Sequence, residues 1–171
     1  NLELTENLKE KSKKGSLIWV LDKTSTTMGG RTLRKWIEEP LINKEEINKR
    51  LDSVDELFNN IYFTEELRES LKNIYDIERI VGKISNKNVN AKDLVSLNMS
   101  LLKLPEIKEK LSQCNSSLLS QWHDNLDVLS DISDLLSNAL LDDPSTSNKE
   151  GNIIRKGYSE KVDELREAKL H

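Results

Sequence analysis

Apolar residues recur every three or four positions through most of this chain, which is the spacing of an α-helix that buries one face. Between Pro40 and Asn86 the pattern predicts three successive helices. Their apolar positions are Ile47, Leu51, Val54, Leu57, Phe58 and Ile61, then Leu67, Leu71 and Ile74, then Ile77, Ile80, Val81 and Ile84. Asn43, Thr64 and Asp76 precede these runs, and we expect their side-chain oxygens to cap the three helices.

Helical spacing continues beyond a polar loop at residues 86–90. Leucines at positions 94–104 predict the next helix, and Pro105 stands where a new helix can begin, because its missing N–H is not needed in the first turn. Residues 128–140 predict an amphipathic helix with an acidic outer face. The polar, turn-rich residues 142–152 predict a loop.

The last part of the chain combines a short extended segment with a helix. Ile153 and Ile154 favour the extended segment, and Ser159 is placed to cap a helix whose apolar positions include Val162 and Leu165. No stop signal precedes His171, so we expect the natural polypeptide to continue beyond it.

Residues 22–41 form the stretch around which we expect the rest to be organised. It contains the pair Gly29 and Gly30, followed by a short helix that Pro40 ends. This helix has an apolar and a basic side, made by Leu33, Trp36 and Ile37 and by Arg31, Arg34 and Lys35. We expect the indole side to pack centrally against several neighbours, and the glycines to let another backbone approach closely.

Composition agrees with a helical protein. The chain has 171 residues, enough for about one domain, and only 6 glycines and 3 prolines. Strand-type runs of β-branched and aromatic residues are scarce, and no fixed repeat is visible. The sequence therefore predicts an all-α, irregular multi-helix bundle with at most a very short extended segment.

Charge argues against a dedicated nucleic-acid-binding domain, which is usually strongly basic. The net charge is -4, and residues 112–147 contain aspartates but no lysine or arginine. The cluster of Arg31, Arg34 and Lys35 could contact phosphate. An ion-paired or solvated helix face is the favoured interpretation, because Glu38 and Glu39 lie within range.

Candidate chemistry is sparse. The glycine pair lacks the spacing of a phosphate-binding loop, and His123 has no cysteine or histidine partner at metal-ligand spacing. Cys114 has no neighbouring cation to lower its pKa, and a single cysteine fits a reducing, cytoplasmic setting. We therefore predict no catalytic, cofactor-binding or metal-binding residue, and the sequence contains no apolar run of membrane-spanning length.

Four segments of the chain nevertheless resemble, in the same order, the middle of the MutS family of DNA mismatch-recognition ATPases. They are NLELTENL, GSLIWVLDKTSTTMGGRTLRKWIEEPL, YDIERIVGKIS and GNIIRKGYSEKVDELREA. The resemblance covers essentially the whole chain. It implies that residues 1–157 are the first segment of the core or lever domain, and that residues 158–171 begin the helical arm leading to the clamp domain.

The resemblance also implies a role without catalysis: coupling DNA engagement at one end of the molecule to ATP turnover at the other. The implied partners are the connector, clamp and ATPase domains of the same chain, and mismatched duplex DNA through the full-length protein, which is expected to be a homodimer. ATP and magnesium would bind that protein elsewhere. The packing expected to stiffen the lever involves Leu33, Trp36, Ile37, Ile77, Ile80 and Ile84. The alternative is a stand-alone helical protein–protein interaction module.

Overall fold

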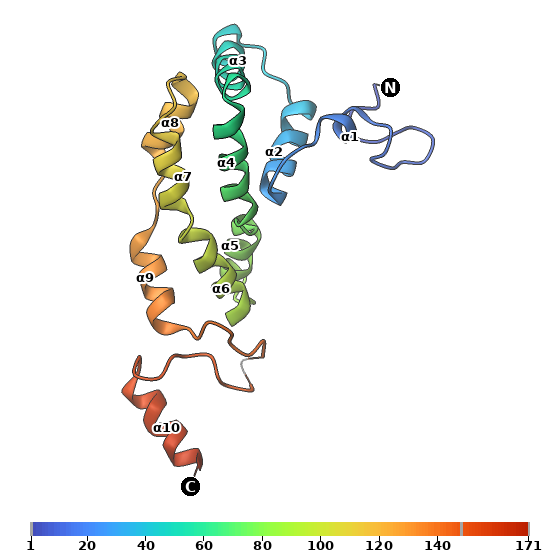
Figure 1. The fold of residues 1–171 in the computed structure, drawn as a ribbon. Coiled ribbons are helices and arrows are strands. Elements are labelled where there is room, and N and C mark those ends of the chain that lie inside the picture. Colours follow the sequence, from blue (N-terminus) through green and yellow to red (C-terminus); the bar gives the residue numbers. More distant parts are fainter. Residues whose placement is uncertain (1, 148, 171) are drawn as a thin grey trace. The chain divides into compact units, whose positions relative to one another are not determined.

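The structure is a computed structural model that describes residues 2–147 and 149–170. These residues form helices and one isolated antiparallel bridge, without a sheet (Figure 1), so the predicted all-α class is confirmed. The chain divides into two compact units. Unit 1 is Asn1–Ile74 with Glu106–Leu126, and unit 2 is Tyr75–Pro105 with Asp127–His171.

Each unit combines helices from separate parts of the sequence. Those of unit 1 are α1 (Leu17–Leu21), α2 (Thr27–Glu38), α3 (Lys44–Asn59), α4 (Ile61–Lys72), most of α7 (Leu104–Leu111) and α8 (Ser117–Asn125). Those of unit 2 are α5 (Ile77–Ser85), α6 (Ala91–Leu101), α9 (Ser130–Ala139) and α10 (Glu160–Leu170). In unit 1, α3 packs against α4 and α8, and in unit 2, α6 packs against α5 and α9.

Two of the three predicted caps are confirmed. The side chains of Asn43 and Asp76 accept hydrogen bonds from the first backbone N–H groups of α3 and α5. The prediction for Thr64 is wrong, because α4 begins one turn earlier and Asn60 caps it. Asn60 alone separates α3 from α4, and the Thr64 hydroxyl donates to the carbonyl of Leu57 at 2.6 Å.

Each unit has its own small apolar core. In unit 2, the buried residues are Ile80, Leu97 and Leu101, with Ile77, Val89, Leu94, Leu104 and Leu136 packed against them. In unit 1, they are Ile107, Leu111 and Leu119, with Leu57, Leu67, Leu71, Ile74, Cys114 and Leu126 around them. The predicted packing of Ile77 and Ile80 is confirmed. Ile84 is 41% exposed, contrary to prediction, because it lies in the last turn of α5, beyond the residues that form the core.

Helix α2 does not have the central position predicted for it. It has no buried residue, Leu33 and Ile37 are half-buried, and Trp36 is 36% exposed. The guanidinium carbon of Arg50 lies 3.6 Å from the centre of a Trp36 ring. A cation over an indole face is favourable, so a single charged side chain of α3 occupies a place where we expected several apolar neighbours.

The glycine pair of α2 is close to side chains instead of to a second backbone. A Cβ built on Gly29 would lie 3.0 Å from Thr26 Oγ1, and one on Gly30 would lie 3.4 Å from Thr24 Oγ1. The Thr26 hydroxyl also accepts a hydrogen bond from Gly29 N–H at 2.9 Å. The two glycines therefore make room for the threonine-rich turn that caps their own helix.

Glu56 of α3 joins that helix to the start of α8. Its carboxylate accepts hydrogen bonds from the backbone N–H groups of Asn115 at 2.6 Å and Ser116 at 2.7 Å. The buried Ser53 hydroxyl of α3 donates to the Ser116 hydroxyl at 3.1 Å. Burial alone would raise the pKa of Glu56, but these hydrogen bonds lower it more, so the pKa lies below its ordinary value.

Truncating a core residue is expected to cost far more stability than truncating an exposed one. Leu119 is 2% exposed, so Leu119→Ala should lower the free energy of unfolding by about 2–5 kcal/mol. Tyr62 is 89% exposed, and Tyr62→Ala should change it by less than about 0.5 kcal/mol. Urea unfolding followed by circular dichroism measures both, and equal effects would contradict this core.

The stability that the Glu56 carboxylate contributes should depend on pH. Glu56→Gln leaves one N–H donor of the α8 start unpaired and should cost about 1–3 kcal/mol at pH 7. Because the folded pKa is lowered, the stabilising effect of the carboxylate is present above the unfolded pKa and is lost as pH falls from there through the folded pKa. Thermal melts between pH 7 and pH 3 should show that the difference in melting temperature between the unmodified protein and Glu56→Gln shrinks. A difference that stays constant would argue against this role of the Glu56 carboxylate.

Candidate functional site

The basic side of α2 is largely ion-paired, as the favoured interpretation expected. Arg34 Nε lies 2.9 Å from Glu38 Oε1, and Lys35 Nζ lies 4.0 Å from Glu39 Oε2. Both pairs are exposed i,i+4 pairs on one helix, where each contributes little to stability. Arg31 lies on the same helix and is exposed. Neighbouring carboxylates thus offset the charge of Arg34 and Lys35.

Among the described residues, the metal-ligating side chains do not converge. His123 Nδ1 lies 3.0 Å from Asp124 Oδ1, its sequence neighbour, on α8. Burial and the Glu56 carboxylate raise the pKa of the Cys114 thiol, which favours the unreactive protonated form. Within residues 2–147 and 149–170, no group of three histidine, cysteine or acidic side chains is placed to hold a metal ion. No described helix is both long enough and apolar enough to cross a membrane.

The feature that stands out is how the chain leaves α9 and enters α10. Residues 152–155, which we call the strap, run beside the end of α9, where Ile154 forms an antiparallel bridge with Leu140. Leu141 N–H donates to the Ile153 carbonyl at 2.9 Å, and Arg155 N–H donates to the Ala139 carbonyl at 2.8 Å. The extended segment predicted at Ile153 and Ile154 is therefore confirmed.

The Arg155 side chain reinforces the strap. Its Nε donates to the Leu140 carbonyl at 3.1 Å, and its terminal nitrogen lies 2.8 Å from Asp142 Oδ1. Ser145 N–H donates to the Asn152 carbonyl at 3.2 Å, which closes the intervening loop, and Pro144 in that loop is fully buried. Sequence inspection did not single out Arg155 or Pro144. Nothing local to Arg155 signals side-chain partners 13 and 15 positions away, and nothing local to Pro144 signals its burial.

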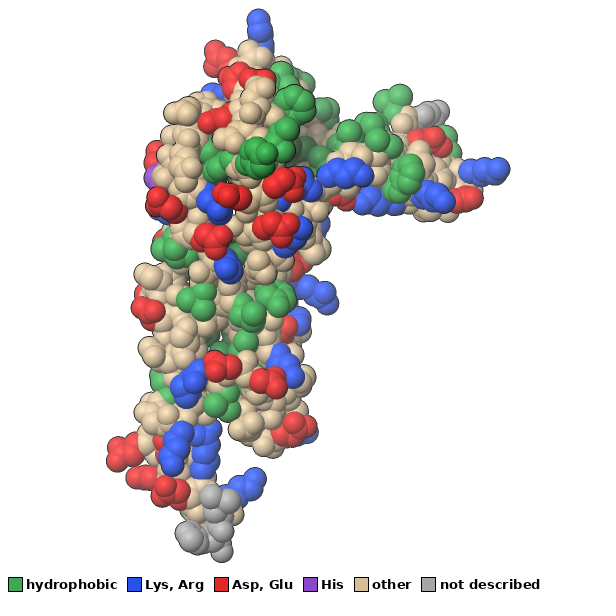
Figure 2. Space-filling view, viewed as in Figure 1, with side chains coloured by type: hydrophobic (Ala, Val, Ile, Leu, Met, Phe, Trp, Pro, Cys, Tyr) green, Lys and Arg blue, Asp and Glu red, His purple; other side chains and the backbone are tan. Residues whose placement is uncertain are grey.

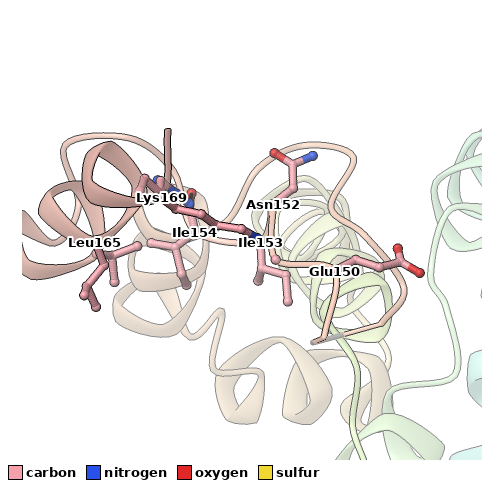
Figure 3. A pocket seen from close by; sticks show the side chains of 9 residues that line it. Glu150, Asn152, Ile153, Ile154, Leu165 and Lys169 are labelled. Atoms are coloured by element: carbon pink, nitrogen blue, oxygen red, sulfur yellow. Dashed lines mark hydrogen bonds between the residues drawn. The ribbon is translucent and has the colours of Figure 1, made fainter. Parts of the chain in front are cut away.

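A hollow of about 700 Å³ lies between the strap and α10. Ile153 and Ile154 line it from the strap, and Leu165 and Lys169 line it from α10 (Figure 3). Its walls are mainly apolar, and Leu165 remains 64% exposed. The hollow leaves apolar surface of the strap and of α10 open to contact.

A second exposed feature is a series of large apolar side chains on α3 and at the start of α4. Figure 2 shows hydrophobic side chains on the surface over α3. We call this the apolar stripe, and it consists of Leu51, Val54, Phe58, Ile61 and Tyr62, which are 58–89% exposed. A contiguous apolar surface of this kind usually marks an interaction site.

Comparison with known proteins identifies relatives over the whole chain. The family described as MutS domain III matches residues 1–170. The chain is 67% identical over all its 171 residues to the DNA mismatch repair protein MutS of Clostridium beijerinckii, and 65% and 59% identical to the proteins of the same name from Clostridium botulinum (strain Eklund 17B) and Clostridium perfringens (strain ATCC 13124). It covers 18%, 18% and 19% of these three relatives, so it spans about a fifth of their length.

Removing the Arg155 guanidinium should loosen the strap without disturbing unit 1. Arg155→Gln loses the ion pair with Asp142, so the Leu141 amide, which the strap protects, should exchange its hydrogen at least several-fold faster. Arg34→Gln, which removes a comparable exposed ion pair from α2, should leave the exchange of the Leu141 amide unchanged. Hydrogen exchange followed by mass spectrometry measures this, and unaltered exchange in Arg155→Gln would show that the side chain does not hold the strap.

Proposed function

The chain belongs to the MutS family, and we propose that it is the first segment of the core or lever domain of a mismatch-repair ATPase. In this proposal it couples the engagement of mismatched duplex DNA by one part of the full-length protein to ATP turnover in another part. It carries out no reaction itself. Residues 158–171 begin the helical arm that leads to the clamp, and ATP and magnesium bind a separate domain.

The observation that carries the proposal is the way the strap connects α10 to the end of α9 within unit 2. A lever passes on a displacement only if its joints do not absorb it. The strap is tied to the end of α9 by two backbone hydrogen bonds and by the Arg155 side chain. In this proposal, a displacement of α10 is therefore passed through a hydrogen-bonded segment to α9, which packs on α6.

The apolar stripe supports a place inside a larger assembly. The exposed side chains of Phe58 and Tyr62 would lose contact with water if another domain packed over them, at about 25 cal/mol per Å² of apolar surface. Relatives extend well beyond the length of this chain, so the same polypeptide can supply that domain. We propose the remaining domains of the chain as the partners of the stripe.

The alternative is a stand-alone helical module that binds a different protein through the apolar stripe. The two proposals differ in what the α10 joint must do. A binding module needs only an intact stripe on α3 and α4, whereas a lever also needs a stiff connection at residues 152–157. An experiment that softens this connection and leaves the stripe untouched separates them.

The test is a three-glycine insertion between Lys156 and Gly157 in the full-length protein that contains this chain. The insertion lengthens the link between the strap and α10 and leaves both cores intact. ATP hydrolysis without DNA should stay unchanged, because the proposed ATP site lies elsewhere. Its stimulation by mismatched duplex DNA should fall by about fivefold or more, the lower range of typical coupling free energies.

The matched control is the same insertion between Thr146 and Ser147, in the polar loop that precedes the strap. This insertion does not lie between the strap and α10, so stimulation by DNA should be retained. Undiminished stimulation by DNA in both insertion variants would refute the lever role. An equal loss in both would show that any added residues disturb this region, and would likewise refute the special role of the α10 joint.

A further inference from the structure

The first turns of α10 carry two side chains that fold back onto the segment before the helix. Asp163 Oδ2 accepts a hydrogen bond from Gly157 N–H at 2.7 Å, and Asp163 Oδ1 lies 3.0 Å from a terminal nitrogen of Arg166. The other terminal nitrogen of Arg166 donates to the Ile154 carbonyl at 2.5 Å. One carboxylate and one guanidinium therefore connect α10 to both the turn and the strap.

We propose that Asp163 and Arg166 form a clasp that sets the direction in which α10 leaves the strap, and that they are thereby positioning residues for the coupling proposed above. This inference deepens the proposed function and rests on it. The strap is fixed to α9 on one side by Arg155, and the clasp fixes α10 to the strap on the other side. Together they make a continuous hydrogen-bonded connection from α9 to α10.

The geometry differs from that of an ordinary surface ion pair. The side chains of Asp163 and Arg166 are only 20% and 35% exposed, whereas those of Arg34 and Glu38 are 48% and 45% exposed. Two of the three clasp contacts go to backbone groups outside α10, so they constrain where the helix lies, in addition to stabilising the helix itself. Hydrogen bonds to charged groups are among the stronger ones in proteins.

The turn that the clasp holds contains a glycine in the left-handed region. Gly157 has φ of +85°, in the region that glycine adopts without strain. Its N–H points to Asp163 and is part of the clasp. A longer or more mobile turn would separate this donor from the carboxylate, so the conformation of the turn and the clasp depend on each other.

The experiment measures the direction of α10 and the coupling separately, in the full-length protein. Spin labels replace Asp134 on α9 and Glu164 on α10, both exposed positions, in a background without other reactive cysteines. Pulsed electron paramagnetic resonance then gives the distribution of distances between them. The clasp variants are Asp163→Ala and Arg166→Gln, and Glu167→Ala, an exposed residue of the same helix, is the matched control.

The expected result is a single narrow distance in the unmodified and Glu167→Ala proteins and a clearly broader distribution in both clasp variants. The exchanged pair Asp163→Arg with Arg166→Asp should not restore the narrow distance. It restores the two opposite charges, but an arginine at position 163 cannot accept the Gly157 hydrogen bond and an aspartate at position 166 cannot donate to Ile154. Rescue by the exchanged pair would overturn the proposal, because it would reduce the clasp to an ion pair.

Stimulation of ATP hydrolysis by mismatched duplex DNA is measured on the same variants. Broadened distances with stimulation reduced about fivefold or more support both the clasp and the lever. Narrow distances in Asp163→Ala and Arg166→Gln overturn the clasp, whatever the stimulation. Broadened distances with full stimulation leave the clasp in place and overturn the lever role on which its function rests.

Discussion

The strap depends on a general requirement: a backbone that leaves a helix must find partners for its N–H and C=O groups. The strap forms one isolated bridge at Ile154, and the described chain offers it no sheet. The end of α9 supplies the missing partners, through the carbonyl of Ala139 and the N–H of Leu141. The end of one helix thus holds the segment that leads to the next helix, α10.

The two apolar cores are small. Each core rests on three buried aliphatic side chains, with partly buried ones packed against them. Helix-to-helix joints are reinforced by polar contacts, such as Glu56 with the start of α8 and Lys83 with Asp93, whose atoms lie 2.6 Å apart. Small cores with hydrogen-bonded joints leave much apolar surface free, and the exposed stripe on α3 and α4 is one result.

Local signals in the sequence were enough for most of the helices. Asn43 and Asp76 cap α3 and α5 because the acceptor and its donor lie within three residues of each other. Thr64 failed as a cap because Asn60, a stronger cap one turn earlier, was available. The position of Trp36 was predicted wrongly, since a helical pattern shows that one face is apolar but not whether another element covers it.

The candidate site was less predictable than the fold. The pair Ile153 and Ile154 indicated an extended segment, but two residues carry no information about which backbone they will pair with. Arg155, Asp163 and Arg166 look like ordinary charged residues in the sequence, and only contacts to backbone groups 6 to 15 positions away distinguish them. The family resemblance implied the role that we propose for the region, and it did not indicate these contacts.

Coupling between two binding sites is reciprocal, so it can be measured at equilibrium without reference to any rate. The most direct measurement compares the dissociation constant of the full-length protein for mismatched duplex DNA with and without a non-hydrolysable ATP analogue, in unmodified protein and in Arg155→Gln. The account predicts that the analogue changes the constant about 5- to 150-fold in the unmodified protein and by a clearly smaller factor in the variant. The same factor in both proteins would contradict it.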